Sequence, residues 1–193
     1  MRRLVPLALV VLAAAGCGGG GGGEPLSLAG AQIDPPSGAP DFALVDQDGR
    51  RVTVSGQRGH WLVITFLYTH CPDVCPLIAA NLNRAIATPA GRRAGLRVLA
   101  VSVDPARDTP AAVRRYARDH RLRPAFHYLI GSRAQLRRVW ADYHVAARPG
   151  PSDTVAHSSF ELLVDPDGQL RLLYDARITT AELAGDLATL EAA

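Results

Sequence analysis

Two thiols and one imidazole are the residues whose types and spacing best suit chemistry in this sequence. Cys71 and Cys75 lie four positions apart in the stretch CPDVCP over residues 71–76. A disulfide needs Cβ atoms about 3.5–4.5 Å apart, whereas residues four apart on a helix hold theirs about 5–6 Å apart. The spacing therefore suits a metal ion between two thiolates at least as well as disulfide exchange. Taken alone the motif is weak, and a structural or redox cystine is its simplest interpretation.

His157 favours a metal site over a cystine. It is expected at the entrance to a late strand, after a loop long enough to bring it to the face that carries the two cysteines. Two thiolates and one imidazole suit Cu(I), and also Cu(II) when a further weak ligand is present. The alternative is an ordinary surface or core histidine.

The elements around the cysteines are predicted from apolar runs. Residues 61–67 and 96–103 are continuous apolar runs rich in β-branched side chains, which is typical of strands covered on both faces. Residues 76–87 have a helical pattern, so the cysteines lie between a buried strand and a helix. The N–H groups and dipole of a helix N-terminus favour the thiolate form of a nearby cysteine.

The other expected elements complete an alternating order. They are a hairpin over 42–54, a helix from Pro110 to about His120 capped by Thr109, a strand over 126–130, a helix from Ser132 to about Tyr143, strands over 158–164 and 170–174, and a final helix from Thr179 or Thr180. Residues 24–40 contain four prolines and are expected to form an extended lead-in. The order predicts an α/β fold, a thioredoxin-like sandwich with an N-terminal β-hairpin extension.

The N-terminal residues predict export. Two arginines precede 12 apolar residues, 4–15, whose helical length of roughly 18 Å is short of the roughly 30 Å bilayer core. Ala14 to Cys17 resembles the bacterial lipobox, with simple signal cleavage and a free Cys17 as the alternative. The expected organisation is a lipoprotein signal peptide over 1–16, a lipidated Cys17 and flexible tether over 17–37, and one thioredoxin-like domain over 38–193. Lipidation of Cys17 leaves Cys71 and Cys75 as a pair in an oxidising compartment.

Composition excludes several classes of protein. The 193 residues are 48% hydrophobic and 20% charged, which suits one globular domain and argues against a disordered or collagen-like protein. The one long apolar run is short, which argues against a multi-span membrane protein. All 21 basic residues are Arg, and without Arg2 and Arg3 there remain 19 against 18 acidic residues. A balance of +1 gives no general case for nucleic-acid binding.

Three blocks resemble the signature of the Sco/SenC family. They are residues 68–76, residues 102–110, and residues 157–160 leading into 164–168, and they occur in the family's order over roughly residues 38–190. The resemblance implies a membrane-tethered copper protein of thioredoxin fold that helps assemble the dinuclear copper site of cytochrome c oxidase subunit II. It assigns one copper, as Cu(I) or Cu(II), to Cys71, Cys75 and His157. Leu67 departs from the pattern, because a Gly often stands there.

Two functions therefore compete. The first is a copper metallochaperone, lipid-anchored on the extracytoplasmic face of a bacterial cell membrane, with oxidase subunit II and other copper chaperones as partners and no nucleic acid. The second is a thiol–disulfide reductase in which Cys71 attacks, Cys75 closes the disulfide, and a thioredoxin-like protein restores the dithiol. A peroxiredoxin-type peroxidase is disfavoured, because Ile64 and Tyr68 replace the Pro and Thr that normally precede its cysteine. An inert structural cystine is also disfavoured.

Several other polar or aromatic residues are expected to have ordinary roles. His70 is expected in loop hydrogen bonding, Asp73 at a turn or surface, and Asp104 close to the site as a turn residue or partner contact. The two tryptophans are expected in the core. A basic run on the second main helix and its exit is expected to form a solvated face: Arg114, Arg115, Arg118, Arg121 and Arg123.

Overall fold

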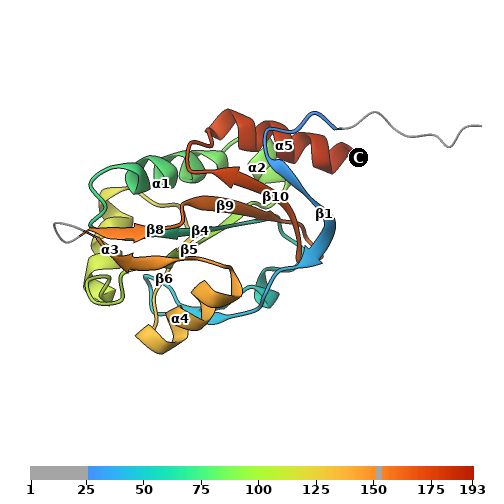
Figure 1. Ribbon diagram of the computed structural model, residues 1–193. Helices are drawn as coiled ribbons and strands as arrows, with labels where there is room; N and C mark the ends of the chain where they lie inside the picture. The colour runs from blue at the N-terminus through green and yellow to red at the C-terminus, as the bar shows by residue number, and fades with distance from the viewer. Residues whose placement is uncertain (1–25, 151–153) are drawn as a thin grey trace, which may run out of the picture.

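A six-stranded mixed sheet forms the centre of the computed structural model, which describes residues 26–150 and 154–193. Its strands are β1 (Ala31–Gly38), β4 (Leu62–Leu67), β5 (Arg97–Ser102), β6 (Phe126–Leu129), β9 (Phe160–Val164) and β10 (Gln169–Asp175). Their spatial order is β1-β10-β9-β4-β5-β6 (Figure 1). Strands β4, β5 and β6 are parallel, and β9, β10 and β1 continue the sheet in antiparallel pairs.

Helices cover both faces of this sheet. They are α1 (Val74–Ala85), α2 (Pro89–Arg93), α3 (Pro110–Asp119), α4 (Arg133–Asp142) and α5 (Thr180–Ala192). Helices α1, α2 and α5 lie on one side, and α4 lies on the other with the small hairpin β2 (Ala43–Val45) and β3 (Arg51–Thr53) (Figure 1). The thioredoxin-like α/β architecture and the N-terminal hairpin are therefore confirmed. The predicted caps Thr109 and Ser132 each accept a backbone N–H of the first turn of their helix. Thr179, one of the two predicted starts of the last helix, caps α5 in the same way.

Strand β4 is the buried centre of the sheet. All six of its residues are buried, as its continuous apolar run predicts for a strand covered on both faces. On the α4 side, the Phe66 ring lies 5.9 Å from that of Tyr143 and 5.7 Å from that of Phe160. This central position holds the C-terminal end of β4, where the cysteine loop begins.

The extended lead-in is part of the sheet. Residues 31–38, which the sequence placed largely in a flexible tether, pair with β10 as an edge strand. Prolines are tolerated on such edges because one side of the strand needs no N–H donor. The Asp186 carboxylate fixes the approach by accepting the backbone N–H groups of Ala29 and Gly30, each at 2.9 Å.

Residues 1–25, with the predicted signal peptide and Cys17, lie outside the described part of the chain. Among the residues that are described, none of the helices combines the length and apolarity needed to cross a bilayer.

Three further details differ from the sequence prediction. Helix α1 begins at Val74, two residues earlier than expected, and the short helix α2 was not predicted although Thr88 and Pro89 are a cap and first-turn pair. The expected loop before His157 contains a hairpin, β7 (Ala147–Pro149) and β8 (Val155–His157). This hairpin has no long apolar run, and cross-strand pairing defines it.

Glu161 is a buried carboxylic acid among the apolar side chains of the core. It lies on β9 opposite Thr65 of β4, is fully buried, and accepts a hydrogen bond from the Thr65 hydroxyl at 3.3 Å. Its Oε2 atom has no hydrogen-bond partner among the described residues. Burial raises the pKa of Glu161 to about 8, because the charged form loses its hydration.

Candidate metal centre

The two cysteines lie at the junction between β4 and α1. Strand β4 ends at Leu67 and α1 begins at Val74, so Cys71 lies in the connection and Cys75 in the first helical turn. Both are free thiols, with Cys71 half-buried and Cys75 fully buried. The carboxyl end of a buried strand in an α/β sheet is the usual place for a ligand site.

The Cys71 sulfur caps helix α1. The N-cap residue Asp73 makes no side-chain cap hydrogen bond, and the Cys75 N–H donates to Cys71 Sγ at 3.4 Å instead. A sulfur in this position receives an otherwise unpaired N–H group and the positive end of the helix dipole. Both effects stabilise a thiolate.

The two thiols differ in acidity. The pKa of Cys71 is lowered to about 5, chiefly because the Cys75 thiol donates a hydrogen bond to it. The N–H groups of Asp73 and Cys75 and a hydrogen bond from Tyr68 act in the same direction. The pKa of Cys75 is raised, because it donates to Cys71 and is buried. At neutral pH the pair therefore holds one thiolate and one proton.

Asp108 fixes the start of the cysteine loop. Its carboxylate accepts the Thr69 N–H at 3.0 Å, the Thr69 hydroxyl at 2.6 Å and the Ser102 hydroxyl at 2.6 Å. Ser102 is the last residue of β5, so one buried carboxylate joins the ends of two parallel strands. The Thr69 proton goes to Asp108, so the 2.9 Å contact of Thr69 Oγ1 with His70 Nδ1 is donated by the imidazole. His70 thus has the predicted loop hydrogen bond.

His157 lies at the end of β8 with one ring nitrogen already bound. Its Nδ1 lies 2.8 Å from the Ser158 carbonyl oxygen, which can only accept, so Nδ1 carries the proton. In the neutral ring, Nε2 then holds the lone pair that binds metals, an arrangement typical of metal-ligating histidines.

His157 is not assembled with the two thiols in this structure. Over residues 26–150 and 154–193, no three His, Cys, Asp or Glu side chains are grouped closely enough to hold a metal ion. Tyr68 connects the two parts of the candidate site, because its ring contacts His157 edge-on with centroids 5.8 Å apart and it hydrogen-bonds Cys71. The ligand set of Cys71, Cys75 and His157 remains a prediction.

Asp73 and Asp104 fall where they were expected. Asp73 is exposed at the helix start. Asp104 follows β5, and its carbonyl oxygen accepts the N–H groups of Arg107 and Asp108, which makes a turn. Its carboxylate binds Arg107 Nε at 2.5 Å.

The sequence profile of the SCO1/SenC family matches residues 30–192. The chain belongs to this family. A mitochondrial SCO2 homolog of Bos taurus is 36% identical over 157 residues, which cover 77% of this chain and 58% of the relative. The copper-bound ScoI of Bradyrhizobium japonicum is 33% identical with a TM-score of 0.67, covering 79% of this chain and 98% of that one. The apo Sco1 of Thermus thermophilus is 29% identical with a TM-score of 0.71, covering 89% and 100%.

These likenesses cover the folded domain. The chain spans about half the length of the curated relatives it matches. Family membership and the thioredoxin-like fold are thus established for this chain, and its cargo and partners are matters of proposal.

Two residues at the site fall inside the family blocks, but the sequence analysis gave them no role in the site. Tyr68 and Asp108 contribute through contacts across strands, to the β7–β8 hairpin and to β5 respectively. A tyrosine at a strand end and an aspartate before Thr109 carry no such signal in the sequence.

Proposed function

We propose that this chain is a copper metallochaperone that binds one copper through Cys71, Cys75 and His157. The observation that carries the proposal is the arrangement of the donors: Cys71 Sγ accepts the Cys75 N–H at the start of α1, and the Nδ1–H of His157 is held by the Ser158 carbonyl oxygen, which leaves Nε2 for a metal. Soft thiolates with an imidazole suit copper. Family membership supports the same cargo, because solved relatives hold copper.

We infer an order of ligand binding from the exposure and acidity of the two thiols. Cys71 is half-buried and already ionised, so its sulfur meets the incoming ion first. Cys75 loses its proton to solvent when it binds, because metal binding requires the thiolate. His157 then completes the set through Nε2, which requires the β7–β8 hairpin and the cysteine loop to approach each other. Delivery is the reverse, with thiols of the recipient replacing the three ligands one at a time.

Copper titration of the full chain tests this proposal. The reduced, anaerobic protein is expected to bind one copper, and its Cu(II) form is expected to show an intense thiolate-to-copper absorption band. His157→Ala should collapse that band and weaken Cu(II) more than Cu(I). His60→Ala is the matched control, since His60 precedes β4 and lies at the opposite end of that strand from the cysteine loop. Unchanged copper binding in Cys75→Ala would refute the proposed site.

A second function is favoured by the asymmetry of the two thiols. A half-buried thiolate beside a buried thiol is the arrangement of a dithiol reductase. The Cys71 thiolate attacks a partner disulfide, forms a mixed disulfide and releases one partner thiolate. Cys75, on losing its proton, attacks Cys71 Sγ, closes the internal disulfide and releases the second partner sulfur. Cys75→Ser should trap the mixed disulfide, and a chain that closes reversibly without binding copper would favour this function.

The proposed recipient is the dinuclear copper site of cytochrome c oxidase subunit II, and the proposed location is the extracytoplasmic face of a cell membrane. Support comes from the family blocks and from the signal-like residues before Cys17. A Cys17→Ala variant should move from the membrane fraction to the soluble fraction. Mass analysis of the N-terminal peptide of the unaltered chain should show a lipid on Cys17.

A further inference from the structure

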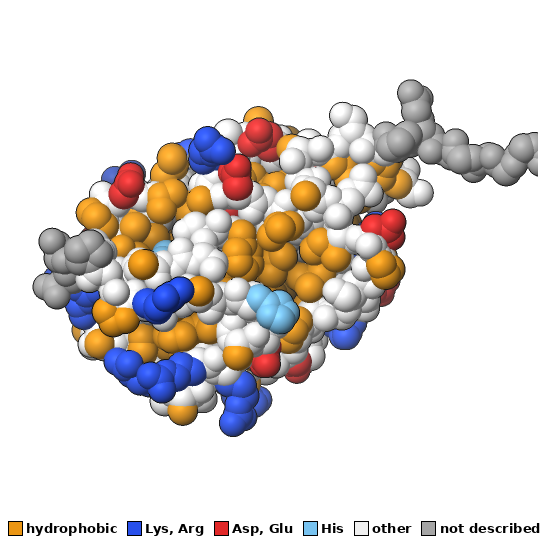
Figure 2. Space-filling model, in the orientation of Figure 1, with side chains coloured by type: hydrophobic (Ala, Val, Ile, Leu, Met, Phe, Trp, Pro, Cys, Tyr) orange, Lys and Arg blue, Asp and Glu red, His pale blue; other side chains and the backbone are white. Residues whose placement is uncertain are grey.

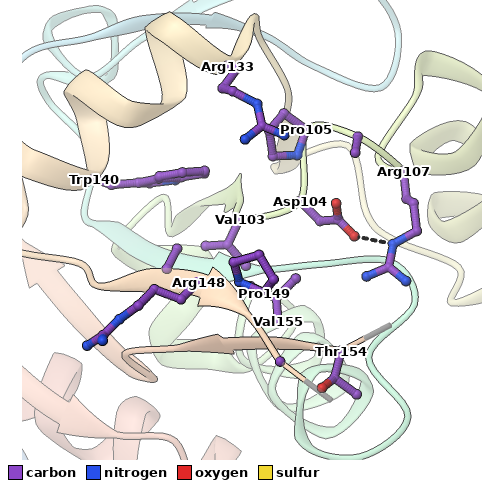
Figure 3. A pocket seen from close by; sticks show the side chains of 13 residues that line it. Val103, Asp104, Pro105, Arg107, Arg133, Trp140, Arg148, Pro149, Thr154 and Val155 are labelled. Carbon is purple, nitrogen blue, oxygen red and sulfur yellow. Dashed lines mark hydrogen bonds and ion pairs between the residues drawn. The ribbon is translucent and has the colours of Figure 1, made fainter. Parts of the chain in front are cut away.

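A cleft of about 390 Å³ opens beside the β7–β8 hairpin (Figure 3). Three segments line it: the turn after β5, helix α4 and the hairpin itself. Val155, in its wall, precedes His157 by two residues on β8. The cleft and a proposed copper ligand therefore share one short strand.

The wall of the cleft is apolar around Trp140. Its indole N–H donates to the Ser102 carbonyl oxygen at 3.0 Å, so the donor is satisfied inside the protein. Pro105, Pro149 and Val155 line the same space. The sequence placed Trp140 in the core, but the structure leaves it half-buried in this wall. Trp61 is buried as expected.

The rim of the cleft is basic. Arg133 of α4 and Arg148 of β7 are exposed, and within the described residues neither guanidinium has an ion pair or hydrogen bond. Arg133 reaches down toward Pro105, and Arg148 extends outward on the other side of Trp140 (Figure 3). The acidic lining residue, Asp104, is bound to Arg107. Figure 2 shows Arg side chains gathered around this part of the molecular surface.

We propose that this cleft binds an acidic segment of the protein that receives copper. Arg133 and Arg148 hold carboxylates of the segment, and an adjacent apolar or aromatic side chain packs on Trp140. Guanidinium groups bind carboxylates through paired N–H donors, and a concave apolar wall suits a side chain. The inference rests on the proposed function, because ligand exchange requires the recipient to dock beside His157.

A defined peptide tests the binding directly. The probe is acetyl-Gly-Glu-Phe-Glu-Gly-amide, and its control replaces both glutamates with glutamines. The chain has two tryptophans, so the two indole N–H signals of the reduced, copper-free, ¹⁵N-labelled full chain report separately on the cleft and on the core. The Trp140 signal should shift saturably while that of Trp61 stays fixed. The glutamine peptide should bind about tenfold more weakly, and added salt should weaken the glutamate peptide.

Matched variants distinguish binding in this cleft from nonspecific attraction to the positive charge of the protein. Arg133→Gln with Arg148→Gln should weaken the peptide about tenfold. Arg114→Gln with Arg118→Gln, which removes two exposed charges from α3, should leave binding unchanged. An unmoved Trp140 signal, or equal weakening by both pairs, would overturn the proposal. A Trp140 shift caused by phosphatidylglycerol vesicles and not by the peptide would assign the cleft to a membrane surface and also overturn it.

Copper transfer distinguishes this inference from the proposed function. The probe is the reduced, copper-free soluble domain of an oxidase subunit II. Arg133→Gln with Arg148→Gln should slow Cu(I) transfer to it about tenfold and leave copper affinity unchanged. If this variant binds copper normally and transfers it at the unaltered rate, the docking site is refuted and the chaperone function still stands. Failure of the unaltered chain to bind copper would refute the chaperone function, and with it the identity of the occupant.

Discussion

The buried carboxyl of Glu161 should make the stability of this domain fall as pH rises. Its pKa lies at about 8 in the folded protein, against an ordinary value of 4.5. The folded state therefore binds the proton more tightly than the unfolded chain does. Stability from this group is complete below about pH 4.5, is lost as pH rises, and reaches its minimum above about pH 8.

The size of the effect follows from the same two values. Each tenfold change in proton affinity is worth about 1.4 kcal/mol, so the full loss between pH 4 and pH 9 is about 5 kcal/mol. At pH 7 about 3 kcal/mol of it has already been lost. Typical domains are stable by about 5–15 kcal/mol, so the effect is large enough to measure.

Glu161→Gln removes the titration and keeps the shape of the side chain. The new amide group lies where Oε2 has no hydrogen-bond partner, so it is buried without a partner too. This lowers the free energy of unfolding of the variant by about 1–3 kcal/mol at every pH. Urea denaturation followed by tryptophan fluorescence should show the variant gaining about 5 kcal/mol on the unaltered protein between pH 4 and pH 9. Thr65→Val removes the hydroxyl that lowers the Glu161 pKa, so its stability loss should extend to higher pH. Parallel pH profiles for Glu161→Gln and the unaltered protein would refute the reasoning.

The remaining predictions concern the cysteine loop and the N-terminal edge of the sheet. Iodoacetamide at pH 6 should alkylate Cys71 and spare Cys75. In Cys75→Ala the pKa of Cys71 should rise above about 5, because the hydrogen bond from the Cys75 thiol is lost. Mass spectrometry of the alkylated protein gives the pH midpoint of Cys71 alkylation, and an unchanged midpoint in the variant would contradict that hydrogen bond. Asp108→Asn replaces the carboxylate that accepts hydrogen bonds from Thr69 of the loop and Ser102 of β5, so alkylation of the buried Cys75 should become faster. Asp186→Asn weakens the anchor of the lead-in to β1 and should lower the free energy of unfolding by about 1–3 kcal/mol, which urea denaturation will measure.

Much of the fold was predictable because local signals agree with the tertiary structure. Thr109 and Ser132 begin helices where their cap chemistry predicts, and the last helix begins at Thr180, one of its two predicted starts. The apolar run predicted at 61–67 contains the central buried strand. The misses are elements without such signals. Residues 31–38 carry prolines and exposed side chains, and they form a strand because β10 offers an edge to pair with.

The candidate site divides in the same way. The sequence places Cys71 and Cys75 after a buried strand and at the start of a helix, and the structure puts Cys71 in the connection after β4 and Cys75 in the first turn of α1. The sequence does not reveal that the Cys71 sulfur caps α1 or that Asp108 joins the ends of β4 and β5. Nor does it reveal that Tyr68 contacts both Cys71 and His157. These contacts join residues that are distant along the chain or depend on the local path of the loop.

By itself the sequence determined which donors are available, the order of the main strands and helices, and the family blocks, because these depend on residue type and short-range spacing. The tertiary structure alone decided the protonation of the thiol pair, the bound nitrogen of His157, the isolation of Glu161 and the basic cleft around Trp140. Each of these depends on burial and on which groups from distant segments meet, and those quantities exist only after the chain has folded.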